Sequence, residues 1–299
     1  MLARCAPALF VLIWSTGFVV ARATVPHAAP QLILLARMAL TSALMGGAAL
    51  LVRERWPRGR QLALHVLAGA LLNGIYLCTS WWAISRGMPA GVMSLLGALQ
   101  PLVVAVASFL FLGERLPARG WIGLGIGLLG VMLVLGPLLD RGLGAAVPAY
   151  VVFGAVTSIL AMAAGTMIQS GSLATDGLRS SSSIQNLSGA GVALIAAVAQ
   201  GDTHWDNAAE LWIGLGWAAV MLSAAALSLL VWMTRNQGAT RVSILLLLVP
   251  PLTALETRLL FDERLTSLQL LGFALALGGV LLARMARVGT KGDEPVPNG

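Results

Sequence analysis

Two ionisable side chains stand inside long apolar stretches of the sequence, where charges are uncommon. Arg37 lies in the apolar stretch 31–52, and Glu256 lies in the apolar stretch 239–261. Placing a charge at the centre of a lipid bilayer costs at least ~2.5–3.5 kcal/mol, so such groups usually face a cavity or a partner. Arg37 is therefore a candidate to bind a substrate carboxylate through its planar fork of donors, and Glu256 is a candidate to carry a coupling proton.

Both residues also have a structural interpretation, which the sequence leaves open. Arg37 is equally suited to be a counter-ion for Glu256 or to bind carbonyl groups at a helix end. Glu256 can be paired with Arg37 or with Arg258, although residues two positions apart do not share a helix face. The two interpretations predict different neighbours for the Glu256 carboxylate.

Aromatic and polar side chains follow helical spacing in the first and third of the apolar stretches. Trp14 and Phe18 are four residues apart, with Ser15 beside Trp14, and Asn73 and Tyr76 are three residues apart. Such spacing places each pair on one stripe of a helix. A mostly apolar wall with a few fixed polar groups is typical of a small-molecule pocket, so these residues are predicted to bind substrate. The alternative is ordinary packing and hydrogen bonding between helices.

Prolines in the middle of the fourth and ninth apolar stretches give a second sign of a cavity. Pro101 follows Gln100 in the fourth stretch, and Pro250 lies in the ninth. A proline within a helix removes a backbone donor and frees carbonyl groups, which in lipid must find partners or line a wet cavity. We expect Gln100, Pro101 and Pro250 to meet at one central pocket, together with the Gln169 amide. The alternative for the prolines is a tolerated packing kink.

The sequence holds no pattern typical of a catalytic or metal site. His27, His65 and His204 have no sequence neighbours suited to bind a metal or act as a catalytic base, so structural roles are expected. Asp176 is expected to cap the helix that follows it. The motifs DDxxD, HExxH and GxSxG are missing, and we predict no catalytic residue, no metal site and no cofactor.

Composition indicates that these residues are carried by membrane helices. Of the 299 residues, 58% are apolar and 10% are charged, whereas about 25% of residues are charged in an ordinary soluble domain. A soluble globule is therefore excluded. The runs Leu124 to Leu135 and Leu268 to Ala283 are apolar on both faces, which excludes a membrane barrel and predicts an all-α membrane protein. The formal net charge of +7 is interpreted as a signal of orientation and not of a nucleic-acid partner.

Ten apolar stretches predict ten transmembrane helices. They cover residues 5–22, 31–52, 61–85, 89–112, 118–138, 147–169, 180–200, 210–234, 239–261 and 266–286. The segments between them are too short for a soluble domain, and residues 289–299 are expected to form a disordered cytoplasmic tail. Arginines concentrate in alternate loops, so the positive-inside rule predicts that both termini are cytoplasmic.

The sequence repeats itself at an offset of 149 residues. The offset pairs Arg86 with Arg235, Ala90 with Ala239, Ser94 with Ser243, Pro101 with Pro250, Glu114-Arg115-Leu116 with Glu263-Arg264-Leu265, Gly123 with Gly272, and Gly130 with Gly279. This pattern predicts a duplication of five helices, with repeats at 1–142 and 143–288. Because five is odd, the second copy enters the membrane from the opposite side, and the halves form an inverted pair, as in many transporters.

Short motifs occur in a recognisable order along the chain. They are Trp14-Ser15-Thr16-Gly17-Phe18, Arg37, Gln100-Pro101, Gly113-Glu114-Arg115-Leu116, Gln169, Asp176, Arg179, Gln185, the run from Val249 to Glu256, and Asp262-Glu263-Arg264-Leu265. In this order they resemble a permease of the drug/metabolite transporter superfamily, EamA type, over essentially residues 1–287. The resemblance implies a basket-like fold of ten helices that exports amino acids, other small metabolites or drugs by alternating access.

These features together predict a multi-pass secondary transporter of a bacterial-type inner membrane that exports a small metabolite, amino acid or drug-like compound. Its expected partners are the lipid bilayer, a small-molecule substrate and, as a candidate coupling ion, a proton. Two alternatives are a non-transporting membrane scaffold or sensor and an intramembrane enzyme. A cavity near Pro101 and Pro250 distinguishes a transporter from a scaffold.

Overall fold

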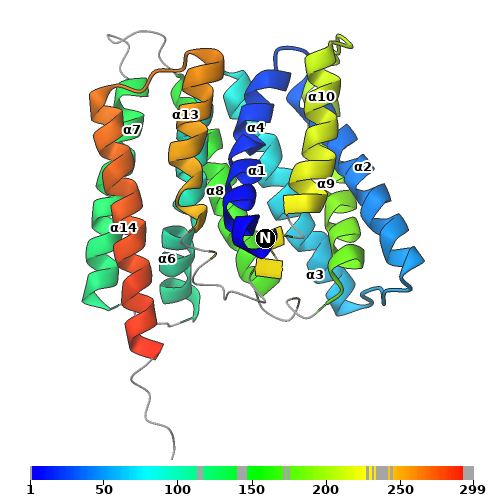
Figure 1. Ribbon diagram of the computed structural model, residues 1–299, viewed down its shortest axis with the longest axis horizontal. Helices are drawn as coiled ribbons and strands as arrows, with labels where there is room; N and C mark the ends of the chain where they lie inside the picture. Colours follow the sequence, from blue (N-terminus) through cyan, green and yellow to red (C-terminus); the bar gives the residue numbers. More distant parts are fainter. Residues whose placement is uncertain are drawn as a thin grey trace, which may run out of the picture.

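The computed structural model is a bundle of helices that run side by side (Figure 1). It describes residues 2–112, 117–139, 147–170, 173, 176–226, 229–230, 232–233, 242 and 245–291. Within this part of the chain every regular element is a helix and no strand is formed. The motif at 113–116, the boundary at 142 and most of the expected tail at 289–299 lie outside the described residues.

The first half of the chain contributes helices that match the first five apolar stretches. They are α1 (Leu2–Thr24), α2 (Pro30–Leu51), α3 (Arg60–Gly69) continued by η1 (Ala70–Ile75) and α4 (Tyr76–Ser85), α5 (Ala90–Ala98), α6 (Gln100–Leu112) and α7 (Ala118–Leu139). The second half contributes α8 (Ala149–Ser170), α9 (Leu178–Gln200), α10 (Ala209–Trp217) continued by η2 (Ala218–Ala226), α13 (Val249–Phe261) and α14 (Ser267–Lys291).

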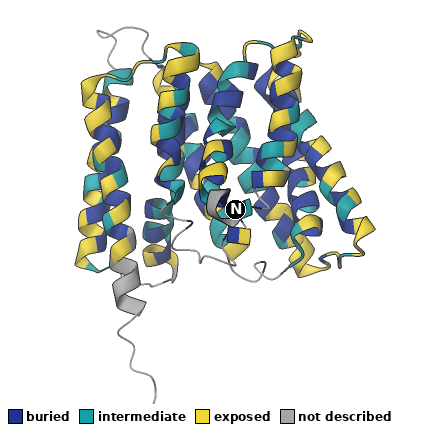
Figure 2. Ribbon diagram, viewed as in Figure 1, coloured by how far each residue is buried: buried dark blue, intermediate teal, exposed yellow. Residues whose placement is uncertain are grey.

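Seven helical segments of the described chain are long and apolar enough to cross a membrane, and two shorter apolar helices cover 209–223 and 267–283. The stretch 239–261 holds α13 in its second half, and residues 239–241, 243 and 244 of its first half lie outside the described residues. Large apolar side chains such as Phe153, Ile195 and Leu259 are 71–75% exposed. Exposed residues recur along the length of the helices (Figure 2). A soluble protein rarely exposes so much apolar surface, whereas lipid covers it without cost.

Helices α7 and α14 pack against each other through glycines. A Cβ atom on Gly123 would lie 2.6 Å from the Gly279 carbonyl oxygen, and one on Gly130 would lie 2.6 Å from the Gly272 carbonyl oxygen. The two helices are therefore antiparallel, because the residue number rises along one as it falls along the other. The glycines let the two backbones approach closely, so they form a tight packing face between the helices.

Helices α2 and α9 form a second close antiparallel pair. The Ser42 hydroxyl donates to the Ser183 carbonyl oxygen over 2.9 Å, and the Ser183 hydroxyl donates to the Ser42 carbonyl oxygen over the same distance. Further along, a Cβ atom on Gly189 would lie 2.9 Å from the Met38 sulfur. Hydrogen bonds between buried hydroxyls and carbonyl oxygens replace the water that these groups lack in a membrane.

In the part of the chain that the structure describes, the helices are irregular at four places that form two pairs at the 149-residue offset. The π-helical segment η1 covers Ala70–Ile75, and the π-helical segment η2 covers Ala218–Ala226. A turn at Leu99 separates α5 from α6, and a turn at residues 247–248 precedes α13. Pro101 and Pro250 each occupy the second position of the helix that follows the turn. They therefore lie in a first helical turn, where a missing N–H costs little, and not inside an unbroken helix as expected.

Candidate functional site

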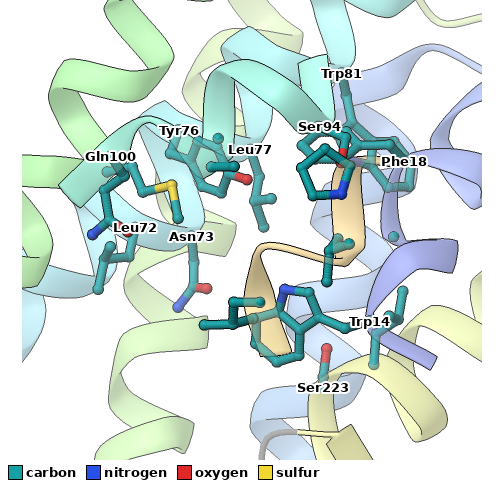
Figure 3. Close-up of a pocket in the computed structure, with 18 of the residues that line it drawn as sticks. Trp14, Phe18, Leu72, Asn73, Tyr76, Leu77, Trp81, Ser94, Gln100 and Ser223 are labelled. Atoms are coloured by element: carbon teal, nitrogen blue, oxygen red, sulfur yellow. The ribbon is translucent and has the colours of Figure 1, made fainter. Parts of the chain in front are cut away.

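A cavity of about 290 Å³ is lined by residues from both halves of the chain, and Figure 3 shows many of their side chains. Its wall is formed by α1, α2, α4 to α6, α8, α9, both π-helical segments and residues 246–250. Both turns and both π-helical segments contribute to it or adjoin it. Irregular backbone at membrane depth is tolerated where it lines a cavity or is buried in protein, and π-helical turns are frequent at functional sites.

Eight of the ten residues expected to bind substrate line this cavity. They are Trp14, Phe18, Arg37, Asn73, Tyr76, Gln100, Pro101 and Pro250. The first and last of these come from segments more than two hundred residues apart in the chain. The spacing patterns of the separate helices thus converge on one space.

Aromatic rings form much of the wall. Trp14 and Phe18 come from α1 and Tyr76 and Trp81 come from α4, and Figure 3 shows their rings around the same cavity. Trp14 is supported from behind by Phe10, with ring centroids 5.2 Å apart and planes inclined by 43°. Trp81 is almost fully buried. The rings are held by packing, so they offer a preformed apolar surface to a ligand.

The polar groups of the wall differ in whether they already have partners. The Gln100 amide donates to the Thr166 hydroxyl over 2.6 Å, and the Asn186 amide donates to the Ser182 carbonyl oxygen over 2.9 Å. The Asn73 amide and the Tyr76 hydroxyl make no hydrogen bond to any described residue. These two side chains therefore have donors and acceptors available to a ligand.

Arg37 is held at the cavity by contacts other than an ion pair. Its Nε and Nη2 atoms donate to the Ser223 hydroxyl over 3.4 and 3.3 Å, and its guanidinium carbon lies 6.0 Å from the centre of the Trp81 ring. Among the described residues it has no acidic partner. The alternative in which Arg37 is the counter-ion of Glu256 is therefore wrong.

Glu256 lies beside the cavity wall and not on it. Its Oε1 atom accepts a hydrogen bond of 2.7 Å from the Ser15 hydroxyl, and its Oε2 atom is buried without a hydrogen-bond partner. No basic side chain of the described chain, Arg258 included, pairs with it. The alternative in which Glu256 is paired with Arg37 or Arg258 is therefore wrong as well.

Ser15 and Gln169 were expected in the pocket, and neither lines it. Ser15 is fully buried, and its carbonyl oxygen accepts a hydrogen bond of 3.0 Å from the Thr253 hydroxyl, so it joins α1 to α13. Gln169 is exposed and is the penultimate residue of α8. It follows Met162, which lines the cavity, by two helical turns, or about 10 Å along the axis. Gln169 is on the expected face of its helix but too far towards the end.

An ion pair joins three elements at the end of the bundle near the start of α5. The Arg22 Nε atom donates to Glu263 Oε1 over 3.0 Å, and the Ala90 backbone N–H donates to Glu263 Oε2 over 3.2 Å. Arg22 also lies over the Phe261 ring, 5.6 Å from its centre. One carboxylate thus ties α1 to the start of α5, where the positive end of the helix dipole favours it.

His65 lies in a buried polar cluster that the sequence did not indicate. Its Nε2 atom is 2.9 Å from Asp176 Oδ2 and 3.2 Å from the Ser181 hydroxyl, and its Nδ1 atom is 3.1 Å from the Gln185 amide nitrogen. In a serine hydrolase the acid and the serine contact opposite ring nitrogens. Here both contact the same nitrogen, so the cluster connects α3 to α9 and is not arranged for nucleophilic catalysis.

The start of α9 is capped by a residue from another loop. Glu54 Oε1 accepts hydrogen bonds from the Ser180 backbone N–H over 2.8 Å and from the Ser180 hydroxyl over 2.9 Å. Burial alone would raise the pKa of Glu54, but these bonds and that from Arg179 outweigh it and hold the pKa below its usual range. The expectation that Asp176 caps this helix is therefore wrong.

Comparison with known proteins identifies the family. The model of the EamA-like transporter family matches residues 3–136 and again residues 149–285. The chain belongs to the EamA-like transporter family. It is therefore a membrane protein of a family of drug/metabolite-type transporters. The expected resemblance is confirmed.

Two similar proteins place the chain further. It is 30% identical to Protein PecM of Dickeya dadantii (strain 3937) over 123 residues, which are 41% of this chain and 39% of PecM. The match thus spans about two fifths of the length of that relative. A chain of known crystal structure superposes with a TM-score of 0.65 at 18% identity, covering 97% of this chain and 98% of that one. At this identity the likeness shows a shared fold alone.

Proposed function

We propose that this protein is a secondary transporter that exports a small molecule from the cytoplasm by alternating access, with the central cavity as its substrate site. The observation that carries the proposal is that residues from both segments matched by the family model line one cavity. The paired turns and π-helical segments border the same cavity. Secondary transporters with repeated halves bind substrate near the bilayer midplane, where helices are interrupted. A scaffold has no need of such a space.

The proposed topology has ten transmembrane helices in two inverted repeats, at 1–142 and 143–288, with both termini in the cytoplasm of a bacterial-type cell. The antiparallel packing of α7 on α14 supports it, because these are the fifth helices of the two copies. Gly123 contacts Gly279, and Gly130 contacts Gly272. Each contact becomes the other when the copies are exchanged by the 149-residue offset, as a two-fold axis requires. The tail 289–299 is proposed to be disordered.

The eight lining residues named above are proposed to contact substrate during transport. Gly97 offers a direct test, because a Cβ atom there would approach only the Tyr76 hydroxyl, at 3.8 Å, across the cavity. A leucine at 97 therefore fills the space without displacing backbone. Gly125 is the matched control, because it is exposed on α7 and a Cβ atom there meets nothing within 4 Å.

The experiment is uptake by proteoliposomes over a panel of radiolabelled metabolites and drugs, with the protein inserted in both orientations. The wild type is expected to accumulate at least one compound, Gly97→Leu to lose that uptake by at least tenfold, and Gly125→Leu to retain it. Uptake that is equal in Gly97→Leu and wild type rejects the cavity as the substrate site. No uptake of any compound by folded wild-type protein supports the scaffold alternative.

Glu256 is proposed as the group that binds the coupling proton. Burying a carboxylate oxygen without a cation or hydrogen bond costs free energy, which the binding of a proton removes. Glu256 is such a group, and its hydrogen bond to Ser15 spans α1 and α13, on two halves that are proposed to rock. Protonation can therefore be linked to the relative position of these helices.

The Glu256→Gln variant tests this role, since the amide oxygen still accepts the Ser15 hydrogen bond. Accumulation driven by a pH gradient is expected to disappear, while substrate exchange without a gradient continues. Asp262→Asn is the control, because Asp262 is 74% exposed and pairs with Arg264. A Glu256→Gln protein that still responds fully to the gradient excludes the proton-carrier role.

A further inference from the structure

We propose that the cavity selects a small organic anion, with one carboxylate, a flat apolar body and no ammonium group. The inference rests on the proposed function, in that it takes the central cavity as the substrate site. It concerns the charge and shape of the ligand that this cavity can hold.

The charge on the described cavity wall is of one sign. Arg37 lines it, and none of the acidic residues that the structure describes does so. Residues 227–244, which are described only in part, contain no aspartate or glutamate in the sequence. An ammonium group in this space would lie near a guanidinium group, with no carboxylate on the described wall to offset the repulsion. A carboxylate in the same space would be attracted.

Arg37 has donors to spare for such an anion. A guanidinium group carries five N–H donors, and in the described chain those of Arg37 reach only the Ser223 hydroxyl, over 3.3 and 3.4 Å. The Ser223 hydroxyl gives its own hydrogen to the Ala218 carbonyl oxygen, 3.0 Å away, so it is oriented to accept. A guanidinium group buried in a membrane protein without an anion is costly, and a ligand carboxylate in bidentate contact would remove that cost.

The rest of the wall fits a flat apolar body. The Trp14, Phe18 and Tyr76 rings face the cavity from two helices. Their faces suit stacking on a ring or a conjugated chain. The Asn73 amide and the Tyr76 hydroxyl can satisfy one further polar group of the ligand. A volume of about 290 Å³ is at the small end of ligand pockets, so a single ring with a short acid chain fits better than a larger drug.

The test compares four probes with one carbon skeleton and different charge. They are 3-phenylpropanoate, phenylalanine, 3-phenylpropylamine and 3-phenylpropan-1-ol, which are an anion, a zwitterion, a cation and a neutral compound. Binding to the full-length protein in detergent is measured by quenching of intrinsic tryptophan fluorescence. The anion is expected to bind at least tenfold more tightly than the alcohol, and phenylalanine and the amine more weakly than the anion by at least the same factor.

Three variants connect that preference to Arg37. Arg37→Gln should weaken binding of 3-phenylpropanoate at least tenfold, to the level of the alcohol, and change binding of the alcohol less than twofold. Arg37→Lys keeps the charge but not the planar fork, so it should retain part of the preference even if Arg37→Gln proves unstable. Arg258→Gln removes an exposed arginine of α13 that is not on the wall, and should match the wild type.

Several outcomes overturn the inference. The inference is wrong if phenylalanine or the amine binds as tightly as 3-phenylpropanoate. It is also wrong if the Arg37→Gln variant still prefers 3-phenylpropanoate over the alcohol. Equal binding of all four probes rejects the proposed preference for an anion, although the cavity is then still a binding site. If no probe binds, the inference fails, and the uptake assay with Gly97→Leu then decides the proposed function independently.

Discussion

The contact between α7 and α14 can be tested with two adjacent glycines that differ only in what they face. A Cβ atom on Gly279 would lie 2.5 Å from the Gly123 carbonyl oxygen, whereas one on Gly278 meets nothing within 4 Å. Both residues are inside α14, so both gain the same helix propensity, up to ~1 kcal/mol, when changed to alanine. The difference between Gly279→Ala and Gly278→Ala therefore isolates the helix contact.

The expected size of that difference follows from the distance. Ordinary contact begins near 3.4 Å, so a methyl group on Gly279 must push two backbones apart by roughly 1 Å, because no flexible side chain is present to yield. Overpacking of this kind typically costs ~1–3 kcal/mol. Gly278→Ala should be neutral or stabilising, and Gly279→Ala should be less stable than it by about that amount.

The assay is thermal unfolding of the purified variants in detergent. Each sample is heated, and the protein that stays soluble is then measured by size-exclusion chromatography. Gly130→Ala serves as a second test, because Gly130 is the 149-residue counterpart of Gly279 and a Cβ atom there would lie 2.6 Å from the Gly272 carbonyl oxygen. Gly130→Ala should lower the unfolding temperature as Gly279→Ala does. If Gly279→Ala and Gly278→Ala unfold at the same temperature, the described packing of α7 on α14 is incorrect.

Three further predictions concern the polar contacts. Glu54→Gln should cost ~0.5–2 kcal/mol at pH 7, because a neutral amide oxygen caps the start of α9 more weakly than a carboxylate does. Since the folded-state pKa of Glu54 is lowered, the contribution of its charge exists above the unfolded value near 4.3 and is lost as pH falls below it, so melts of wild type and variant should converge in acid. Glu263→Ala should destabilise more than Arg22→Ala, because it removes the acceptor of the Ala90 N–H as well as the ion pair; equal losses in melting experiments would contradict this. His65→Leu should cost ~1–3 kcal/mol by leaving the Asp176 and Gln185 side chains without their partner, and an unchanged melting temperature would show that the cluster contributes nothing.

The cavity wall was predictable where the signal is local. The pairs Trp14 with Phe18 and Asn73 with Tyr76 were found from helical spacing, because residues three or four apart share a face whatever the helix packs against. Ser15 shows the limit of the same reasoning. One residue along a helix turns the side chain by about 100°, which carries Ser15 from the cavity to the interface with α13.

Contacts between distant segments were not predictable from one sequence. The Ser15 hydroxyl meets Glu256 across 241 residues, and His65 meets Asp176 across 111. Polar residues in a membrane bundle all require partners, so composition indicates that pairs exist without saying which. An ion pair of Arg37 with Glu256 was the simplest pairing of two intramembrane charges. In the structure each of them instead contacts a serine, Arg37 the Ser223 hydroxyl and Glu256 the Ser15 hydroxyl. The π-helical segments were also missed, since six to nine apolar residues look alike in either helical form.

The paired prolines indicated the position of the cavity better than any single polar residue did. Gln169 is polar and lies on the cavity side of α8, yet it is exposed beyond the cavity, because a polar residue near a helix end can be solvated without a protein partner. Pro101 and Pro250 allow no such freedom. Each requires a helix to start anew, and the backbone groups released by that interruption must be satisfied away from lipid. In a duplicated bundle the place where both copies can meet this requirement at once is the interface between them, which is where the cavity lies.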